Sequence, residues 1–376
     1  MIYLDHNATT PLRPEARAAL LAVLDAALGN PSSAHGAGRV ARAALEKARR
    51  ALGAALDVPA AAVCFTSGAT EANNLALFGA LPVPAAAHVI AAPIEHASVL
   101  APLRELQRRG ARLTWLPVDA AGRVRVADVE AAMTPATALV SVGWANGEIG
   151  TVQPIAEIAA LCRARGVLLH VDAAQAFGKV AIEVGCADLC TLSAHKLGGP
   201  VGIGALVARR GVALRPLGWG GEQERGLRPG TENAAGAAAF AAVVTERPLG
   251  GGVAALRDRL WAAAAALPGV TRHGPEHDGL PNTLCLSVVG LAGEAVVAAL
   301  DLEGVAASVG SACAAGSGEP SPVLLALGCD AATARGGVRF SLGATTTGAE
   351  IDATAAALQR IVERMRGVGA SRAAAG

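Results

Sequence analysis

Short apolar runs alternate with longer helix-like stretches from about residue 60 to residue 207. Seven of these runs have the length of buried strands: Ala61–Phe65, His88–Ala92, Arg112–Pro117, Ala138–Trp144, Val167–Val171, Leu189–Leu192 and Ile203–Ala208. The stretches between them predict helices, among them Glu71–Gly79, Ser98–Arg109, Val126–Met133 and Ile155–Arg165. Strands that alternate with helices of this length predict an α/β fold around a mostly parallel, buried, seven-stranded sheet.

The remainder of the chain predicts a second, smaller α/β unit. A run of Pro and Gly at residues 248–252 suggests a domain junction, and strand patterns follow near Thr283–Val289 and Gly337–Leu342. The last helix is expected over about Ala349–Arg366, with residues 367–376 frayed. A length of 376 residues fits two domains. We expect a large domain over residues 14–249 and a small domain made of residues 1–13 with 250–376.

The charge balance and the apolar pattern exclude several classes of protein. With 32 basic and 31 acidic residues, the chain has no electrostatic footprint for nucleic acid or an anionic membrane. Its longest apolar stretches, such as Ala234–Val244, fall short of the roughly 20 residues that a membrane span needs. The N-terminus does not resemble a secretory signal. Seven cysteines, an odd number in a long chain, favour a reducing, cytoplasmic compartment.

The segment from Phe65 to Glu71 reads as a strand, a glycine turn and a helix start. Gly68 permits the tight turn, and Ala69 and Thr70 then present backbone N–H groups at the N-terminus of the helix. Such N–H groups, together with the Thr70 hydroxyl, form a suitable cradle for phosphate. A capping box that uses Ser67 or Thr70 explains the same residues without a ligand.

Two strand ends carry residue types suited to catalysis. Asp172 ends the run that begins at Val167; alone it also fits a helix N-cap. Lys196 follows the run that ends at Leu192, and it is one of only three lysines among the 32 basic residues. A desolvated lysine has a lowered pKa and can form a Schiff base, whereas the alternative is an ordinary surface lysine.

Cys313 lies among small residues in the segment Ser308–Gly318, a setting that suits a reactive thiol as well as a chance loop cysteine. Cys186 and Cys190 have three residues between them, which is not the usual spacing of a metal-binding pair. No His/Cys pair accompanies them, so we expect core positions for both and no resident metal.

A phosphate cradle, a strand-end aspartate and a strand-end lysine, in this order, are what pyridoxal phosphate needs. The chain also contains a series of ordered motifs: YLDHNATTP, NPSSAHGAGR, FTSGATEANNLA, IEHASVL, ANGEIGTVQPI, LHVDAAQAFGK, SAHKLGGPVGIGAL, GGEQERGLRPGTEN, SVGSACAAGSGEPSPVL and VRFSLG. In these motifs, over nearly its whole length, the chain resembles the cysteine desulfurases of the NifS/IscS type. These belong to the class V aminotransferase group of pyridoxal-phosphate enzymes and have the type I fold.

The resemblance implies a role for each matching residue. Lys196 forms the Schiff base with pyridoxal phosphate, His96 stacks on the ring and moves protons, and Asp172 pairs with the ring nitrogen. The other implied cofactor contacts are Gln175 to the ring hydroxyl and, to the phosphate, Ala69, Thr70, Ser193, His195 and the partner subunit's Thr231. Arg339 clamps the substrate carboxylate, which a guanidinium fork does bidentately, and Asn30 lines the same pocket.

The implied reaction converts L-cysteine to L-alanine and leaves the sulfur as a persulfide on Cys313. That residue would also contact an iron–sulfur cluster during transfer. The implied partners are a second copy of the chain, in an obligate homodimer, and a sulfur-acceptor protein such as an iron–sulfur scaffold. Two alternatives stay open: a related β-elimination such as that of selenocysteine lyase, and a weakened homologue that acts mainly as a binding partner.

Three positions depart from the family pattern. Gly147 stands where the family usually has asparagine, Ala344 where it has arginine, and Pro322 where histidine is common. The asparagine contacts the ring oxygen of the cofactor in relatives. From the sequence we therefore expect Gly147→Asn to tighten binding of pyridoxal phosphate.

Overall fold

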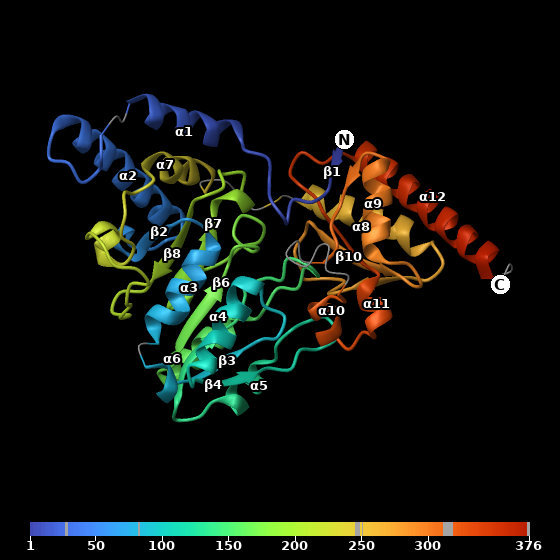
Figure 1. Cartoon of the computed structure of the whole chain (residues 1–376), viewed down its shortest axis with the longest axis horizontal. Coiled ribbons are helices and arrows are strands. Elements are labelled where there is room, and N and C mark those ends of the chain that lie inside the picture. Colours follow the sequence, from blue (N-terminus) through green and yellow to red (C-terminus); the bar gives the residue numbers. More distant parts are fainter. Residues whose placement is uncertain (27–28, 82, 245–248, 250, 311–318, 374–376) are drawn as a thin grey trace.

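A seven-stranded sheet forms the centre of the larger of two bodies of α/β structure (Figure 1). The computed structural model describes residues 1–376 except 27–28, 82, 245–248, 250, 311–318 and 374–376. The strand order is β2-β8-β7-β6-β5-β3-β4. The strands are β2 (Val63–Thr66), β3 (His88–Ala91), β4 (Arg112–Trp115), β5 (Thr137–Ser141), β6 (Leu168–Asp172), β7 (Leu189–Ser193) and β8 (Gly204–Ala208). Only β8 runs antiparallel to its neighbours, so the mostly parallel sheet is confirmed.

Helices cover both faces of this sheet, as parallel sheets require. One face packs against α3 (Ala69–Ala80) and α4 (Ala97–Arg108). The helices on the other face are α1 (Pro14–Ala26), α2 (Gly36–Ala55), α5 (Val126–Ala132), α6 (Ile155–Arg165) and α7 (Ala234–Val243). Short 3-10 helices lie at Ala60–Ala62, Pro84–Ala86, Val184–Cys186, Ala194–Lys196 and Gln223–Gly226.

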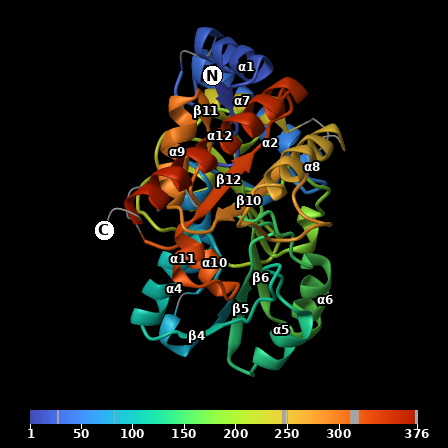
Figure 2. The same ribbon diagram turned by 90° about the vertical axis from the view of Figure 1, so that its right-hand side faces the viewer.

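The smaller body is built on a three-stranded antiparallel sheet, in the order β12-β10-β9. Its strands are β9 (Val270–His273), β10 (Thr283–Val288) and β12 (Gly337–Ser341), and a separate parallel pair joins β1 (Ile2–Tyr3) to β11 (Val305–Ala306). Its helices are α8 (Gly251–Ala265), α9 (Gly293–Leu302), α10 (Pro322–Ala326), α11 (Ala331–Arg335) and α12 (Gly348–Ala373). Figure 2 looks onto this body, with α8, α9 and α12 labelled over its strands.

Alternate residues of β10 face two different cores, as the pleat of a strand dictates. Leu284 and Leu286 pack into the core beneath α8, α9 and α12, whereas Cys285 joins the core that continues into the larger body. Leu4 also packs in the first of these cores, so the N-terminus belongs spatially with the C-terminal part of the chain. The domain boundaries at residues 13/14 and 249/250 stay a prediction.

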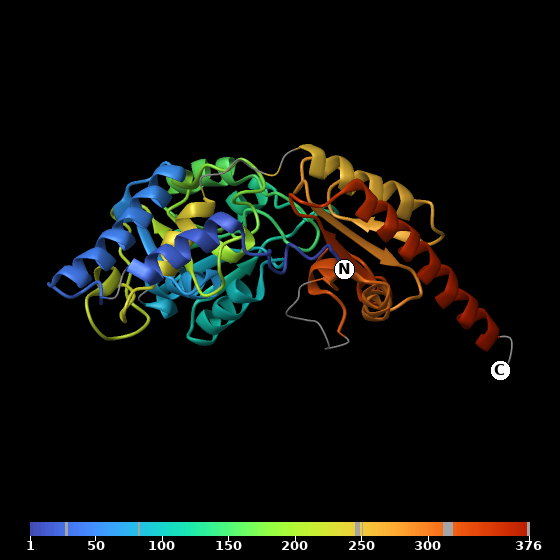
Figure 3. The ribbon, with the colours of Figure 1, turned by 90° about the horizontal axis from the view of Figure 1, so that it is seen from above.

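The last helix is longer than the sequence pattern predicts. The expected end near Arg366 is wrong, because α12 continues to Ala373 (Figure 3). Its two late glycines lower helix propensity without stopping the helix, and the alanines around them favour it. Within the described ranges, every helix is too short or too polar to span a lipid bilayer.

Residues 4–13 connect the two bodies and contact both. The His6 N–H donates to Ser341 O of the smaller body at 3.1 Å, and the Thr10 N–H donates to His195 O of the larger body at 3.0 Å. Arg13 N–H continues this contact by donating to Gly198 O at 2.8 Å. The N-terminal segment is therefore held where the carboxyl ends of the parallel strands meet the smaller body.

Candidate active site

A cavity of about 510 Å³ lies at the junction of the two bodies, beyond the carboxyl ends of the parallel strands. Ligands of open α/β sheets bind at this edge. The larger body contributes the start of α3, His96, Asp172 and Lys196, and the smaller body contributes Arg339. The cavity therefore brings together most of the residues that the sequence singled out.

At one end of the cavity the first backbone N–H groups of α3 have no side-chain cap. Gly68 is the N-cap residue, and Ala69 and Thr70 line the cavity. The Glu71 carboxylate accepts from the Ser67 N–H at 2.7 Å, so one of the two hydrogen bonds of a capping box is present. Because the N-cap glycine has no side chain, the start of α3 remains suited to an anion.

Ser193 and His195 lie beside this helix start. The Ser193 side chain is buried at the end of β7, and its Oγ has no partner among the described residues. A buried hydroxyl without a partner indicates a missing ligand. The His195 ring contacts Thr9 Oγ1 at 3.1 Å, and burial followed by the charge of Lys196 lowers the pKa of His195 to about 4.

The Lys196 amine is held by two backbone carbonyls of the N-terminal segment. Its Nζ donates to Asn7 O at 2.5 Å and to Ala8 O at 2.8 Å. The residue is half-buried, on the 3-10 helix that follows β7, so its exposure lies between those of an ordinary surface lysine and a fully desolvated one. The wall of the cavity, not a closed core, surrounds this amine.

A second lysine, Lys179, is the more deeply buried of the two. Its Nζ donates to Asn7 Oδ1 at 2.7 Å and to Gln175 Oε1 at 2.5 Å. Burial, and then the charges of Lys196 and Arg339, lower the pKa of Lys179 well below its usual value. The sequence analysis does not predict Lys179 as a site residue, although the scarcity of lysine in the chain is a signal that points to it.

Gln175 fills the space beside Gly147. The Gln175 Nε2 donates to Asn7 O at 2.9 Å, and Lys179 holds the other end of the amide. A Cβ atom added to Gly147 would lie 2.7 Å from Gln175 Nε2. Glycine at position 147, where the family usually has asparagine, therefore leaves room for the Gln175 side chain.

His96 and Asp172 are joined through two buried side chains that the sequence analysis did not identify. Asn73 Nδ2 donates to Asp172 Oδ2 at 2.8 Å and lies 2.9 Å from Ser98 Oγ. Ser98 Oγ lies 2.7 Å from His96 Nδ1. Burial lowers the pKa of His96, with an opposing effect of Asp172 and a further lowering by Lys196. The His96 ring lines the cavity.

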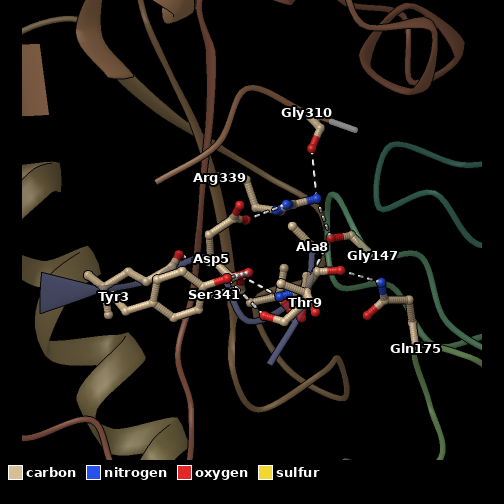
Figure 4. A network of polar contacts seen from close by, with 12 residues as sticks. Tyr3, Asp5, Ala8, Thr9, Gly147, Gln175, Gly310, Arg339 and Ser341 are labelled. Carbon is tan, nitrogen blue, oxygen red and sulfur yellow. Dashed lines mark hydrogen bonds and ion pairs between the residues drawn. The ribbon is translucent and has the colours of Figure 1, made fainter. Parts of the chain in front are cut away.

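Arg339 lies on the smaller body's wall of the cavity and is buried (Figure 4). Its Nη2 forms an ion pair with Asp5 Oδ1 at 2.6 Å, and its Nη1 donates to Gly310 O at 2.7 Å and Gly147 O at 3.3 Å. Its Nε has no partner among the described residues. An N–H group of the guanidinium therefore remains for a substrate carboxylate.

Two further carboxyl groups line the cavity: Glu148 is buried and Glu95 is half-buried. Glu148 accepts from the Ser321 hydroxyl, and burial raises the pKa of this carboxyl. Glu95 accepts from the Gly143 N–H at 2.9 Å, and burial raises its pKa to about 8. Neither has a signal in the sequence beyond its place next to a polar motif residue.

Two predicted site residues that the structure describes do not line the cavity of this chain. Asn30 is exposed, and its Oδ1 accepts from the Ser32 N–H at 2.8 Å. Thr231 is exposed as well. Cys313 lies outside the described residues, so its predicted role is not tested.

Cys186 is half-buried and Cys190 is buried. The described part of the chain has no His/Cys/Asp/Glu cluster able to hold a metal ion.

The family model for the class V aminotransferases matches residues 2–354 of this chain. The chain belongs to the class V aminotransferase family. A cysteine desulfurase of Cereibacter sphaeroides is 44% identical to this family member, covering 97% of this chain and 96% of the relative. The cysteine desulfurase IscS of Dictyoglomus turgidum is 39% identical, covering 97% of this chain and 95% of the relative.

Solved structures agree with this assignment. A NifS-like protein superimposes with a TM-score of 0.88 at 33% identity, covering 96% of this chain and 99% of that protein. The structure described as SspA in complex with cysteine gives a TM-score of 0.82 at 32% identity, covering 92% of this chain and all of that protein. This class V aminotransferase family member therefore has the type I fold of pyridoxal-phosphate enzymes.

Pyridoxal phosphate is the cofactor of this family, and the residues of the cavity fit it. The uncapped start of α3 and the unpartnered, buried Ser193 Oγ suit the phosphate group. Asp172, a hydrogen-bond acceptor, lines the same cavity, which suits a protonated ring nitrogen. Lys196 Nζ supplies the amine for the cofactor aldehyde.

Proposed function

We propose that this chain is a pyridoxal-phosphate-dependent cysteine desulfurase. The proposal depends on one observation: three groups line the same cavity. They are the amine of Lys196, the carboxylate of Asp172, which can accept a hydrogen bond from the ring nitrogen, and the buried guanidinium of Arg339. Relatives named cysteine desulfurase over almost the full length of the chain support it, as does the structural neighbour described in complex with cysteine.

Each of the residues that line the cavity and are named below has a part in this activity. Bound pyridoxal phosphate supplies an electron sink for the negative charge that develops at the substrate Cα. Asp172 keeps a proton on the ring nitrogen, and the start of α3 with Ser193 and His195 holds the phosphate. Lys196 Nζ, released from the cofactor, moves the proton at the substrate Cα. Arg339 orients the substrate through its carboxylate.

The sulfur leaves on Cys313. Its thiol loses a proton, a bond forms between Cys313 Sγ and the substrate sulfur, and the bond between the substrate sulfur and Cβ breaks. The electron pair of that broken bond stays on the substrate carbon, which takes up a proton. L-cysteine and one enzyme thiol thus become L-alanine and one enzyme persulfide, so the atoms balance without an added oxidant.

We also propose a homodimer in which Thr231 reaches the phosphate of the partner subunit. The exposure of Thr231 and its distance in sequence from the rest of the phosphate site fit a contact made across subunits. Asn30, also exposed, is proposed to approach the substrate in the assembled protein. An iron–sulfur scaffold is the proposed sulfur acceptor. The six described cysteines are free thiols, which fits the reducing cytoplasm as the place of action.

The test measures alanine and sulfide released from L-cysteine in the presence of a thiol reductant, for the parent protein and for Cys313→Ala. We expect the variant to keep the fold and the yellow colour but to lose alanine production and the persulfide mass. Cys162→Ala, a change at a buried thiol of α6, is the matched control. A pyridoxal absorption band without alanine from the parent protein would instead support a binding partner that has lost catalysis.

A further inference from the structure

Four side chains form a continuous line of hydrogen bonds along one wall of the cavity. Asp172 ends β6, Asn73 lies in α3, and Ser98 and His96 lie at the start of α4. The distances are 2.8 Å from Asn73 Nδ2 to Asp172 Oδ2, 2.9 Å from Asn73 Nδ2 to Ser98 Oγ, and 2.7 Å from Ser98 Oγ to His96 Nδ1. The two middle members, Asn73 and Ser98, are buried.

The direction of each hydrogen bond in this line follows from its first member. An ionised carboxylate only accepts, so the Asn73 amide must turn its NH2 group, not its oxygen, towards Asp172. The same NH2 group has a second hydrogen, which goes to Ser98 Oγ. The Ser98 hydroxyl is then an acceptor on that side, and its own hydrogen is left for His96 Nδ1.

The backbone independently fixes the last step. His96 is the N-cap residue of α4, and the Ser98 N–H donates to His96 Nδ1 at 3.1 Å. A backbone N–H has no acceptor capacity, so His96 Nδ1 carries no hydrogen. A neutral imidazole must then carry its single hydrogen on Nε2, at the opposite edge of the ring.

We propose that Asn73 and Ser98 are positioning residues that hold His96 as the neutral Nε2–H tautomer, with the orientation set by the carboxylate of Asp172. The group that pairs with the cofactor ring nitrogen and the group that stacks on the ring are thereby coupled through the protein. Within the described part of the chain, Asp172 from β6 and Lys196 from beyond β7 are charged groups that act on the His96 ring.

The tautomer has a consequence for sulfur transfer, and this consequence rests on the proposed function. A resting His96 offers a hydrogen from Nε2 and no lone pair on that edge of the ring. It therefore donates a hydrogen bond and does not accept the proton of the Cys313 thiol. The proton of that thiol must then go to a group other than His96.

The test is nitrogen NMR of the full-length protein with its cofactor and with ¹⁵N-labelled histidine. The chain has eight histidines, and the spectrum of His96→Asn identifies the His96 signals by difference. Between pH 6 and 8 we expect the hydrogen of His96 on Nε2 and an unprotonated Nδ1. A wild-type spectrum with the hydrogen on Nδ1 overturns the proposal, and this measurement needs no variant of the positioning residues.

The variants then identify the cause. Ser98→Ala removes the hydroxyl donor from Nδ1, and we expect the pKa of His96 to rise by about one unit, because the bare nitrogen loses a hydrogen bond. Ser98→Thr keeps a hydroxyl and should restore the parent value. Asn73→Ala should shift the His96 signals in the same direction as Ser98→Ala. Asn74→Ala, at the neighbouring position of α3, is the control and should leave them unchanged.

These readouts separate the inference from the proposed function. An Nε2–H signal in a protein that makes no alanine from L-cysteine leaves the tautomer assignment standing and removes the proposed function. If the protein makes alanine but Ser98→Ala leaves the His96 signals unchanged, the proposed function stands and the inference fails. In that case the hydroxyl does not set the state of the ring, and the proposed coupling is refuted.

Discussion

The two walls of the cavity are built in different ways. On the wall of the larger body, Asp172, Ser193 and Lys196 lie at or just after the ends of neighbouring strands, so the sheet register alone brings them together. On the wall of the smaller body, Arg339 is held by Asp5 and Gly310, residues far from it in sequence. Strand ends position the first wall, whereas long-range polar contacts hold Arg339 on the second, so the two walls should respond differently to substitution.

The largest expected effect is on the wall of the larger body. Lys196→Ala should reduce the rate of alanine production by at least about 10³-fold, as loss of a covalent catalytic group commonly does. The fold should remain, because Lys196 is half-buried on the wall of the cavity and does not belong to the apolar core of either body.

Borohydride reduction of the parent protein followed by peptide mapping checks this assignment directly. The cofactor label should be found on Lys196. A label on the buried Lys179, or on Lys47, would show that the wrong amine has been assigned.

On the other wall, Arg339→Ala should reduce both function and stability. The substitution leaves half-buried Asp5 without its ion-pair partner; loss of one member costs about 3–5 kcal/mol when both are buried, so we expect a smaller cost here. We expect a higher KM for L-cysteine and a lower Tm, with the yellow colour retained because the cofactor contacts lie on the other wall. Arg360→Ala, which breaks an exposed pair with Glu303, is the control and should leave Tm nearly unchanged.

Gly147→Asn tests how closely Gly147 and Gln175 pack beside the cavity. The sequence pattern predicts tighter binding of pyridoxal phosphate, but the structure argues for the opposite sign. The new Cβ would lie 2.7 Å from Gln175 Nε2, and Gln175 is held in place by Asn7 and Lys179. We expect cofactor affinity to fall by about 1–3 kcal/mol, the usual cost of overpacking. Tighter binding in a cofactor titration would show that Gln175 moves aside easily.

The smallest expected effect concerns Glu95 and the pH dependence of stability. Burial raises the pKa of this carboxyl to about 8 in the folded protein, from an unfolded value near 4.5. Between these values the folded state binds the extra proton, so the contribution of Glu95 to stability falls as pH rises through this window.

Glu95→Gln removes this titration and keeps an oxygen to accept from the Gly143 N–H. We expect its Tm to exceed that of the parent by about 2 °C or more at pH 8, and the difference to shrink towards pH 5. Glu157→Gln, at an exposed position in α6, is the control. An equal pH slope in the parent and Glu95→Gln would show that this carboxyl does not bind the proton.

The sequence predicts well those parts of the site that depend on strand ends and helix starts. The apolar runs locate all seven strands of the large sheet, and parallel strands place their carboxyl ends at one edge. Asp172, Lys196 and the Gly68 turn could therefore be assigned to one site before the structure was known, because each lies within a few residues of an element boundary.

Only the tertiary structure determines the residues that link these groups. Asn73 and Ser98 read as ordinary helix residues, and Asn7 reads as part of a polar N-terminal motif, until the fold brings α3, α4 and the N-terminal segment around the same cavity. Hydrogen bonds act over about 3 Å and connect residues up to 337 positions apart in this chain. Local sequence patterns fix the secondary structure, whereas the hydrogen-bond partners of a buried polar group depend on which elements pack against it.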